Sequence, residues 1–355
     1  MEIYFPSGML AVVVPISTLS LASGRAGEAA AWEQIVDPVR PFLDRVSHQL
    51  VAQVEAFEPE IVEYARYALD NRGKQLRPAL IALAGGAVGT VTDELVTVAV
   101  IIEMIHLATL VHDDIMDGAS LRRRRSTLSA RWGNEVSVLL GDCLFAHALK
   151  LAAGFSTADV CRAVADATGI VCAGEILQTH RRHCWNLTRA EYFKVLAMKT
   201  AELFALACEQ GAKMGGGTVG EQQALRRYGL ALGTAYQIYD DCLDLFGAEG
   251  EAGKSLGTDL ANGKLTLPVL IFLENASSEE RAELIGWLEN WHPELLAGVR
   301  DRLERAGALV GSADVIRGYL GEAVAALKGL PPTPSRSALN HFSEFLSQRI
   351  SSLGV

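Results

Sequence analysis

Two apolar stretches of the sequence each end in a cluster of three aspartates. The first cluster is Asp113, Asp114 and Asp117, and the second is Asp240, Asp241 and Asp244. Side chains four residues apart share one face of a helix, and carboxylates this close repel one another unless a cation neutralises them. Such hard oxygen ligands suit Mg²⁺, which proteins hold with carboxylates, water and substrate phosphates. One cluster alone is typical of a solvated helix end, but the repeat predicts two walls of a magnesium site for a diphosphate.

Basic residues near these clusters could bind the phosphates. They are Lys74 and Arg77 in "GKQLRP", Arg122 and Arg123 in the arginine run 122–125, Lys199 beside Thr200, and Lys254 and Lys264 after the second cluster. Arginine forks and lysine point charges are the groups that recognise diphosphates. Any one of them could instead be a solvated surface charge, and the arginine run could be a nucleic-acid patch. The aspartates and the arginines need not be partners for each other.

The composition limits the class of protein. Of the 355 residues, 50% are hydrophobic and only 7% aromatic, which favours a large helical core. The net charge of −10 argues against a general nucleic-acid binder. The six cysteines include no CxxC pair, so free thiols in a reducing compartment are expected. "HRRHC" (180–184) could suggest zinc, but no second ligand pair lies at a suitable spacing, and a polar helix end is the simpler interpretation.

The elements that must position these residues are helices. Apolar residues recur at helical spacing in the segments 95–112, 134–153, 157–180, 188–213, 219–246 and 265–275. Two stretches, 95–112 and 225–246, are apolar nearly all round, as expected of helices in the centre of a bundle. Breaks are expected at glycine-rich segments such as 85–90 and 215–220. No alternating strand pattern, repeat or long linker is visible, so a single all-α domain is predicted.

The N-terminal segment reads differently from the rest. Residues 9–24 are apolar and rich in small residues, but no lysine or arginine precedes them, as a secretory signal would require. The stretch is short for a bilayer span and Pro15 interrupts it. We expect residues 1–32 to be a disordered extension, with weak membrane association as the alternative, and residues 33–355 to form the helical domain.

In these motifs the sequence resembles the polyprenyl synthetase family of trans-isoprenyl diphosphate synthases. The resemblance covers about residues 33–350 and rests on "GKQLRP", "IEMIHLATLVHDDIMD" with "RR", "GNEVSVLLGD", "MKTAELF", "YQIYDDCLDLFG" and "GKSLGTDLANGKLTLP", in the family's order. It implies the isoprenoid synthase type of helical bundle with a central active-site cavity. It also implies a prenyltransferase that joins isopentenyl diphosphate to an allylic diphosphate, head to tail.

The resemblance also implies the role of each residue. Asp113, Asp117 and Asp240 would ligate Mg²⁺, three ions per site, with Asp114, Asp241 and Asp244 in support. Arg122, Lys199 and Lys254 would hold the allylic diphosphate, with Thr200, Gln237 and Lys264. Lys74, Arg77, His106 and Arg123 would hold isopentenyl diphosphate, although His106 could instead be a core histidine. Asp113, Asp117, Asp240, Lys199 and Arg122 form the implied catalytic set. Arg124 departs from the family, which commonly has glycine there.

Product length is expected to depend on the helix face before Asp113. Short-chain members of the family have an aromatic floor one turn before the first aspartate, whereas this sequence has Ala108 and Thr109. Ile105 and Ile102 come next along the face. We therefore expect a product longer than C15, in the range C30–C50, with C20 as the alternative.

Other classes fit the sequence less well. A class I terpene cyclase needs no isopentenyl site, so Lys74, Arg77 and His106 argue against it. A non-catalytic synthase subunit would have lost the acidic motifs, and both are intact. We expect a homodimer that binds no nucleic acid. It would be cytoplasmic or peripherally membrane-associated and would hand its product to membrane enzymes.

Overall fold

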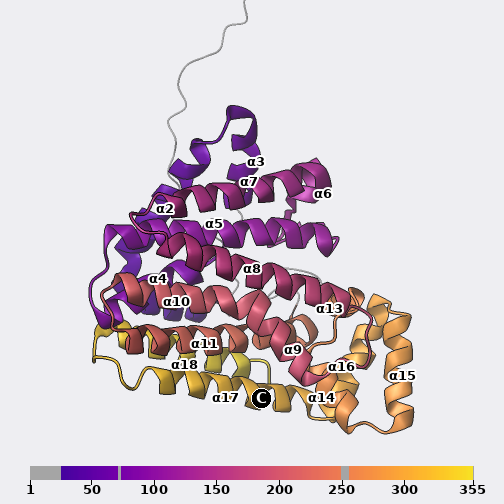
Figure 1. The fold of residues 1–355 in the computed structure, drawn as a ribbon. Coiled ribbons are helices and arrows are strands. Elements are labelled where there is room, and N and C mark those ends of the chain that lie inside the picture. Colours follow the sequence, from indigo (N-terminus) through magenta and orange to yellow (C-terminus); the bar gives the residue numbers. More distant parts are fainter. Residues whose placement is uncertain (1–24, 71–72, 249–255, 355) are drawn as a thin grey trace, which may run out of the picture.

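The computed structural model describes residues 25–70, 73–248 and 256–354, and almost all of its regular structure is helical (Figure 1). The helices are α1 (Arg25–Val36), α2 (Arg40–Glu55), α3 (Pro59–Asp70), α4 (Leu76–Val88), α5 (Asp93–Met116), α6 (Leu128–Trp132), α7 (Asn134–Ala153), α8 (Asp159–His180), α9 (Arg189–Leu196), α10 (Glu202–Met214), α11 (Val219–Phe246), α13 (Thr258–Ala261), α14 (Leu267–Asn275), α15 (Ser278–Glu289), α16 (Leu296–Arg305), α17 (Ala308–Ala326) and α18 (Pro334–Ser351). Short elements are the 3₁₀ turns η1 (Asp37–Val39) and η3 (Pro293–Leu295), the π turn η2 (Ala197–Ala201), and the antiparallel strands β1 (Leu121–Arg122) and β2 (Arg125–Ser126). The all-α prediction is confirmed.

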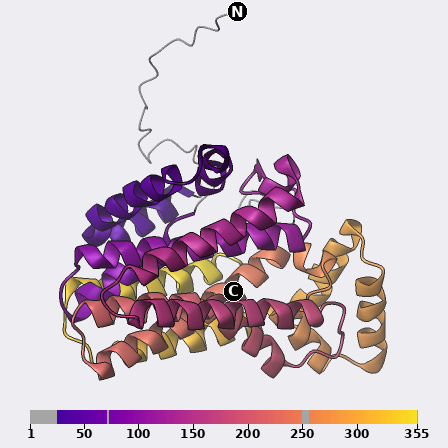
Figure 2. The ribbon, with the colours of Figure 1, turned by 45° about the horizontal axis from the view of Figure 1, so that its top comes forward.

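The centre of the bundle is formed by α5, α10 and α11, in which α10 packs on α11 and also contacts α5. The long helices of the bundle run roughly alongside one another, and Figure 1 shows α8 between α5 and α10 in that view (Figures 1 and 2). Helix α5 is covered by α2, α4, α7 and α10, and α11 lies between α10 and α17. The stretch Val98–Ile102 on α5 has no exposed surface, because its side chains are apolar on every face. The two stretches predicted to be central are therefore both in the core.

Several helix boundaries follow signals in the sequence. The segments expected at 134–153 and 219–246 are α7 and α11, residue for residue. Helix α11 begins at a capping box, in which the Thr218 hydroxyl accepts from the Glu221 N–H and the Glu221 carboxylate accepts from the Thr218 N–H. Helix α5 runs further than expected, from Asp93 to Met116, so that Asp113 and Asp114 are helical and Asp117 caps the C-terminus.

Two segments differ in detail from the sequence prediction: the break expected at 85–90 falls at its end, and the helix expected at 188–213 is continuous but contains a π turn. Helix α4 continues through Gly85 and Gly86 to Val88. A Cβ on Gly85 would lie 3.1 Å from the Gly211 carbonyl oxygen, so the glycine permits the close packing of α4 on α10 instead of ending the helix. The segment 188–213, expected as one helix, contains the π turn η2 between α9 and α10.

The described chain becomes helical earlier than the boundary expected at residue 33. Helix α1 begins at Arg25, and the Trp32 ring meets Phe342 edge to face at a centroid distance of 5.2 Å. Residues 1–24 lie outside the described residues.

Among the described residues, two helices are long and apolar enough to cross a membrane by length and composition. For α5 this reflects the protein core, because 72% of its apolar window is buried. Helix α7 differs, because only 33% of its window is buried. Its exposed apolar side chains include Val138, Leu139 and Leu149, so one face of α7 is apolar and uncovered.

Candidate active site

The first aspartate cluster lies at the C-terminal end of α5. The Asp117 N–H donates to the Asp113 carbonyl at 2.9 Å, and Gly118 follows with a φ of +59° that turns the chain away. The side chain of Asp114 is 8% exposed, whereas those of Asp113 and Asp117 are 19% and 25% exposed. Asp113 and Asp117 are therefore the two members with accessible oxygens.

Two lysines from distant segments neutralise this cluster. Lys199, on the π turn, lies 3.8 Å from an Asp113 carboxylate oxygen, forms an ion pair with Glu175, and donates to the Gln178 side chain at 2.9 Å. Lys264 donates to both Asp117 carboxylate oxygens, at 2.9 and 3.0 Å. The sequence had suggested both lysines, but Glu175 and Gln178 of α8 carry no motif that points to the site.

Two arginines also pair with the cluster. The Arg122 Nε donates to the Asp114 carboxylate at 2.7 Å, so this arginine does pair with an aspartate of the cluster. Burial of Asp114 explains the pairing, because a carboxylate without solvent needs a cation. Arg182, which the sequence did not single out as a ligand, donates to Asp117 at 2.8 Å.

The three aspartates of the first cluster have different pKa shifts, because different numbers of cations lie close to each carboxylate. Burial raises the pKa of Asp113 to about 6, despite the opposing charge of Lys199. The pKa of Asp114 is also raised by burial, against the charge of Arg122. For Asp117 burial acts upward as well, but Lys264, Lys199 and Arg182 together lower its pKa. At Asp113 the nearby cations do not offset the effect of burial, and a bound cation would do so.

The second cluster lies near the end of α11, and two of its members accept hydrogen bonds from neutral donors. The Asp241 carboxylate accepts from the Tyr192 hydroxyl at 2.7 Å and from the Gln237 amide at 2.9 Å. Asp244 has no exposed surface and accepts from the Thr258 hydroxyl at 2.6 Å and the Asp259 N–H at 3.0 Å. Burial raises the pKa of Asp241 to about 8. Asp240, half-buried, accepts no hydrogen bond from the described part of the chain.

The π turn connects the two clusters. Lys199 reaches the first cluster, and the hydroxyl of its neighbour Thr200 donates to Gln237, which in turn donates to Asp241. A π turn adds a residue to the helix and often occurs at functional sites. Here it turns two consecutive side chains towards opposite aspartate helices.

The residues expected to hold isopentenyl diphosphate form a second basic region. Arg77 is buried, and its guanidinium lies 4.8 Å from the centroid of the Phe204 ring. Burial, followed by the charges of Arg77, Arg123 and Arg122, holds the pKa of His106 well below its ordinary value. A lowered pKa favours the neutral imidazole, which would offer a phosphate a hydrogen-bonding nitrogen rather than a charge. Lys74 lies 5.7 Å from the Phe345 ring, and Lys254 is outside the described residues.

The arginine run forms the turn between β1 and β2. Arg123 and Arg124 have φ values of +51° and +64°, a left-handed conformation that glycine adopts without strain. The glycine common in the family at position 124 would suit this backbone. Arg123 packs closely on Gly73, where a Cβ would lie 2.4 Å from its guanidinium, so the turn lies against the "GKQLRP" segment.

The candidate chain-length residues lie in the core of α5. Ala108 and Ile102 have no exposed surface and Ile105 has 1%. The Thr109 hydroxyl donates to the His106 carbonyl at 2.7 Å. Ala108 is fully buried, so its side chain does not line a solvent-exposed channel in this structure.

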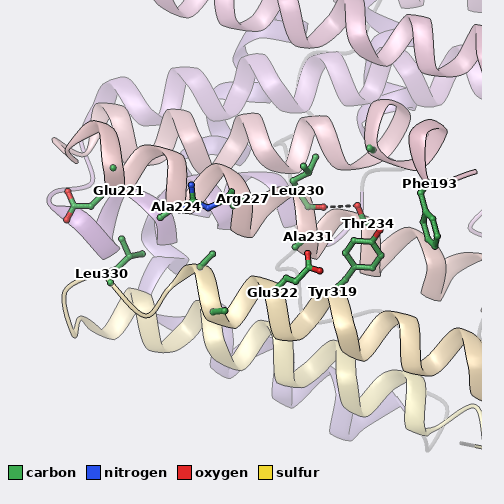
Figure 3. A pocket seen from close by; sticks show the side chains of 15 residues that line it. Phe193, Glu221, Ala224, Arg227, Leu230, Ala231, Thr234, Tyr319, Glu322 and Leu330 are labelled. Carbon is green, nitrogen blue, oxygen red and sulfur yellow. Dashed lines mark hydrogen bonds between the residues drawn. The ribbon is translucent and has the colours of Figure 1, made fainter. Parts of the chain in front are cut away.

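A groove of about 770 Å³ lies elsewhere, on the outer face where α9, α11 and α17 meet (Figure 3). Phe193, Leu230, Ala231, Thr234 and Tyr319 line it. It contains none of the candidate site residues, so this groove is not the expected active-site cavity.

The aspartates can hold a metal only with help from other ligands. In the described ranges, no three histidine, cysteine, aspartate or glutamate side chains form a ready-made metal site, and this includes "HRRHC". The accessible oxygens of Asp113, Asp117 and Asp240 nevertheless fit Mg²⁺, because that ion keeps several waters and takes substrate phosphates as ligands. A metal held here would take waters and substrate phosphates as its other ligands.

Comparison with known proteins identifies the family of this chain. Residues 58–297 match the polyprenyl synthetase family. The chain is similar to the octaprenyl diphosphate synthase of Escherichia coli (34% identity over 306 residues, 86% of this chain and 94% of that protein). It is also similar to a short chain isoprenyl diphosphate synthase of Methanothermobacter thermautotrophicus (32% over 321 residues, 89% and 99%).

The fold agrees as well. A polyprenyl synthase of Caulobacter crescentus CB15, crystallised with calcium and isoprenyl diphosphate, superposes with a TM-score of 0.85 at 34% identity, over 90% of this chain and 98% of that one. The predicted isoprenoid synthase type of bundle is therefore confirmed. The chain belongs to the polyprenyl synthetase family and is a trans-prenyl diphosphate synthase, a prenyltransferase.

Proposed function

We propose that this enzyme condenses isopentenyl diphosphate with an allylic diphosphate, head to tail, to make a long-chain all-trans polyprenyl diphosphate of C30–C50. The observation that carries the proposal is the pairing of Lys199 with Asp113 and of Thr200, through Gln237, with Asp241. This linkage holds two acidic helix ends and a set of cations around one region. Such an arrangement suits a diphosphate whose negative charge grows as it leaves.

Mg²⁺ is the proposed cofactor, three ions per site, with Asp113, Asp117 and Asp240 as ligands and Asp114, Asp241 and Asp244 in support. When bound, it would stabilise the diphosphate as a leaving group. Because Asp241 and Asp244 already accept hydrogen bonds from the protein, they support the second wall by holding α11 and the segment after it in place.

The basic residues would divide between two substrates. Lys199, Lys264 and Arg122 belong to the allylic diphosphate, with Thr200 and Gln237, and Lys254 is assigned to it by resemblance. Lys74, Arg77, Arg123 and neutral His106 belong to isopentenyl diphosphate. The allylic C–O bond breaks, the isopentenyl double bond attacks the resulting cation, and the departing diphosphate accepts the released proton. Apolar walls keep out water, which would capture the cation.

Product length is proposed from the small side chains Ala108 and Thr109, with Ile105 and Ile102 deeper along α5. The relatives include both octaprenyl and short chain synthases at similar identity, so a C20 product remains the alternative. An Ala108→Phe variant is expected to make a shorter product than the wild type, because the ring would fill the path of the growing chain. An unchanged product length on thin-layer chromatography would contradict this tunnel.

The proposed reaction is tested by incubating the enzyme with labelled isopentenyl diphosphate, farnesyl diphosphate and Mg²⁺, and sizing the extracted product. We expect products of C30 or longer, and none when EDTA replaces Mg²⁺. A folded enzyme that incorporates no label with any allylic primer would overturn the proposed function.

A homodimer is proposed from the uncovered apolar face of α7. Val138, Leu139 and Leu149 are exposed there, and Ile176 of the adjacent α8 is 59% exposed. Faces of this kind usually mark an interface. Leu139→Glu is expected to yield monomers in analytical ultracentrifugation, whereas a wild type that is monomeric at micromolar concentration would contradict the dimer. We further propose a cytoplasmic enzyme that passes its product to membrane enzymes.

A further inference from the structure

The "HRRHC" segment contributes a cation to the first aspartate cluster. The Arg182 Nη2 donates to Asp117 at 2.8 Å, and its Nη1 donates to the Met116 carbonyl at 3.0 Å, at the C-terminal end of α5. Its side chain is 18% exposed. Arg182 thus caps the aspartate helix and pairs with a proposed metal ligand at the same time.

The same segment is tied to the loop that carries Lys264. The His183 N–H donates to the Gly263 carbonyl at 2.8 Å, and the His183 ring packs so closely on Gly263 that a Cβ there would lie 2.5 Å from it. Arg182 and Lys264 therefore approach Asp117 from two loops that are hydrogen-bonded to each other. One carboxylate consequently has two cations within hydrogen-bonding distance.

We propose that Arg182 is a positioning residue that occupies Asp117 until a diphosphate arrives, and so couples metal binding to substrate binding. A divalent ion that approached Asp117 alone would meet two positive charges, which repel it. A diphosphate offers Arg182 another anion, and a guanidinium binds phosphate oxygens well. The Arg182 Nε is buried and has no hydrogen-bond partner among the described residues. The guanidinium therefore has one N–H that could donate to a phosphate oxygen.

This inference rests on the proposed function, and its test does not use turnover. Two dissociation constants are measured for the full-length enzyme: that of Mn²⁺ alone, from the electron paramagnetic resonance signal of the free ion, and that of inorganic diphosphate in EDTA, by calorimetry. For Arg182→Gln we expect Mn²⁺ to bind roughly threefold or more tighter and diphosphate roughly threefold or more weaker, the size of one partly buried charged contact. Loss of a purely structural contact would not move the two constants in opposite directions.

Arg181→Gln is the matched control. It makes the same charge change one residue away, where Arg181 pairs with Glu191 and not with the cluster, and it should leave both constants within about twofold of the wild type. Arg182→Lys keeps the positive charge, so both dissociation constants should stay close to those of the wild type. If Arg182→Gln does not fold, Arg182→Met preserves the apolar stem and replaces it.

The inference is overturned if the Arg182 variant leaves either constant unchanged, shifts both in the same direction, or behaves like the Arg181 control. That outcome is distinct from failure of the proposed function, because the wild type would still incorporate isopentenyl units. An inactive wild type with opposite shifts would instead leave the coupling intact and overturn only the reaction.

Discussion

The two aspartate clusters share one sequence pattern but differ in how the protein stabilises them. The first, at the end of α5, is surrounded by the cations Arg122, Arg182, Lys199 and Lys264. In the second, on α11, Asp241 and Asp244 accept hydrogen bonds from hydroxyl, amide and backbone N–H donors. The difference shows that equal spacing of aspartates does not imply equal roles. The first cluster is balanced by charges that a substrate could redistribute, whereas two members of the second hold the fold.

The largest expected effect comes from comparing two variants of the second cluster. Asp240→Ala should lower the rate of prenyl transfer by about 100-fold or more, as expected when an electrostatic group of the site is lost, with little change in the free energy of unfolding. Asp244→Ala should instead destabilise the protein by about 2–3 kcal/mol, because it leaves the Thr258 hydroxyl and the Asp259 N–H without their acceptor. Urea unfolding and initial rates separate the two effects, and equal loss of stability in both variants would contradict the division.

A second prediction concerns the π turn that serves both clusters. A Cβ on Gly174 of α8 would lie 2.7 Å from the Lys199 backbone nitrogen. Gly174→Ala should therefore shift Lys199 and Thr200 together and lower kcat by about tenfold, since small displacements in a site are costly.

Gly169→Ala is the control for this variant, because it lies on the same helix with no atom within 4 Å of the new Cβ. It should keep full activity and stabilise α8 by up to about 1 kcal/mol. If both alanine variants were equally active, the packing of Gly174 would have no part in positioning the π turn.

The smallest expected effect is a difference between the two clusters in how the free energy of unfolding depends on pH. In EDTA, the raised pKa values of Asp113 (about 6) and Asp241 (about 8) mean that the folded state binds protons more readily than the unfolded chain. Their stabilising contribution is complete below the ordinary carboxyl pKa and is lost as pH rises through 6 and through 8, respectively.

Asp241→Asn should therefore remove about 1–2 kcal/mol of the decline in stability between pH 6 and 8, whereas Asp113→Asn should alter only the decline below pH 6. Thermal unfolding across this range measures both. A decline between pH 6 and 8 that survives in Asp241→Asn would assign that titration to another group.

The sequence predicted most of the fold because the relevant signals are local. Apolar periodicity depends on neighbouring residues, so α7 and α11 were located to the residue. The exact end of α4 within the break expected at 85–90 was not predicted, because the role of Gly85 depends on α10, a helix more than a hundred residues later. The same limit explains the π turn, which no local composition marks.

The site was predictable where chemistry repeats in the sequence and not where it depends on tertiary contacts. Both aspartate clusters, Lys199 and Lys264 were identified from motifs. Arg182 and Tyr192 were not, because a single arginine in a loop or a tyrosine in a helix has no distinguishing pattern. The pairing of Arg122 with Asp114 was also missed, since it depends on the turn between β1 and β2.

The central claim is that both aspartate clusters serve one prenyl-transfer reaction. The most direct test measures incorporation of labelled isopentenyl diphosphate, with farnesyl diphosphate and Mg²⁺, by the wild type, Asp113→Asn and Asp240→Asn side by side. The account predicts that the wild type makes a polyprenyl diphosphate, while each variant folds normally and loses at least about 100-fold in rate. Undiminished incorporation by either variant, or none by a folded wild type, would contradict it.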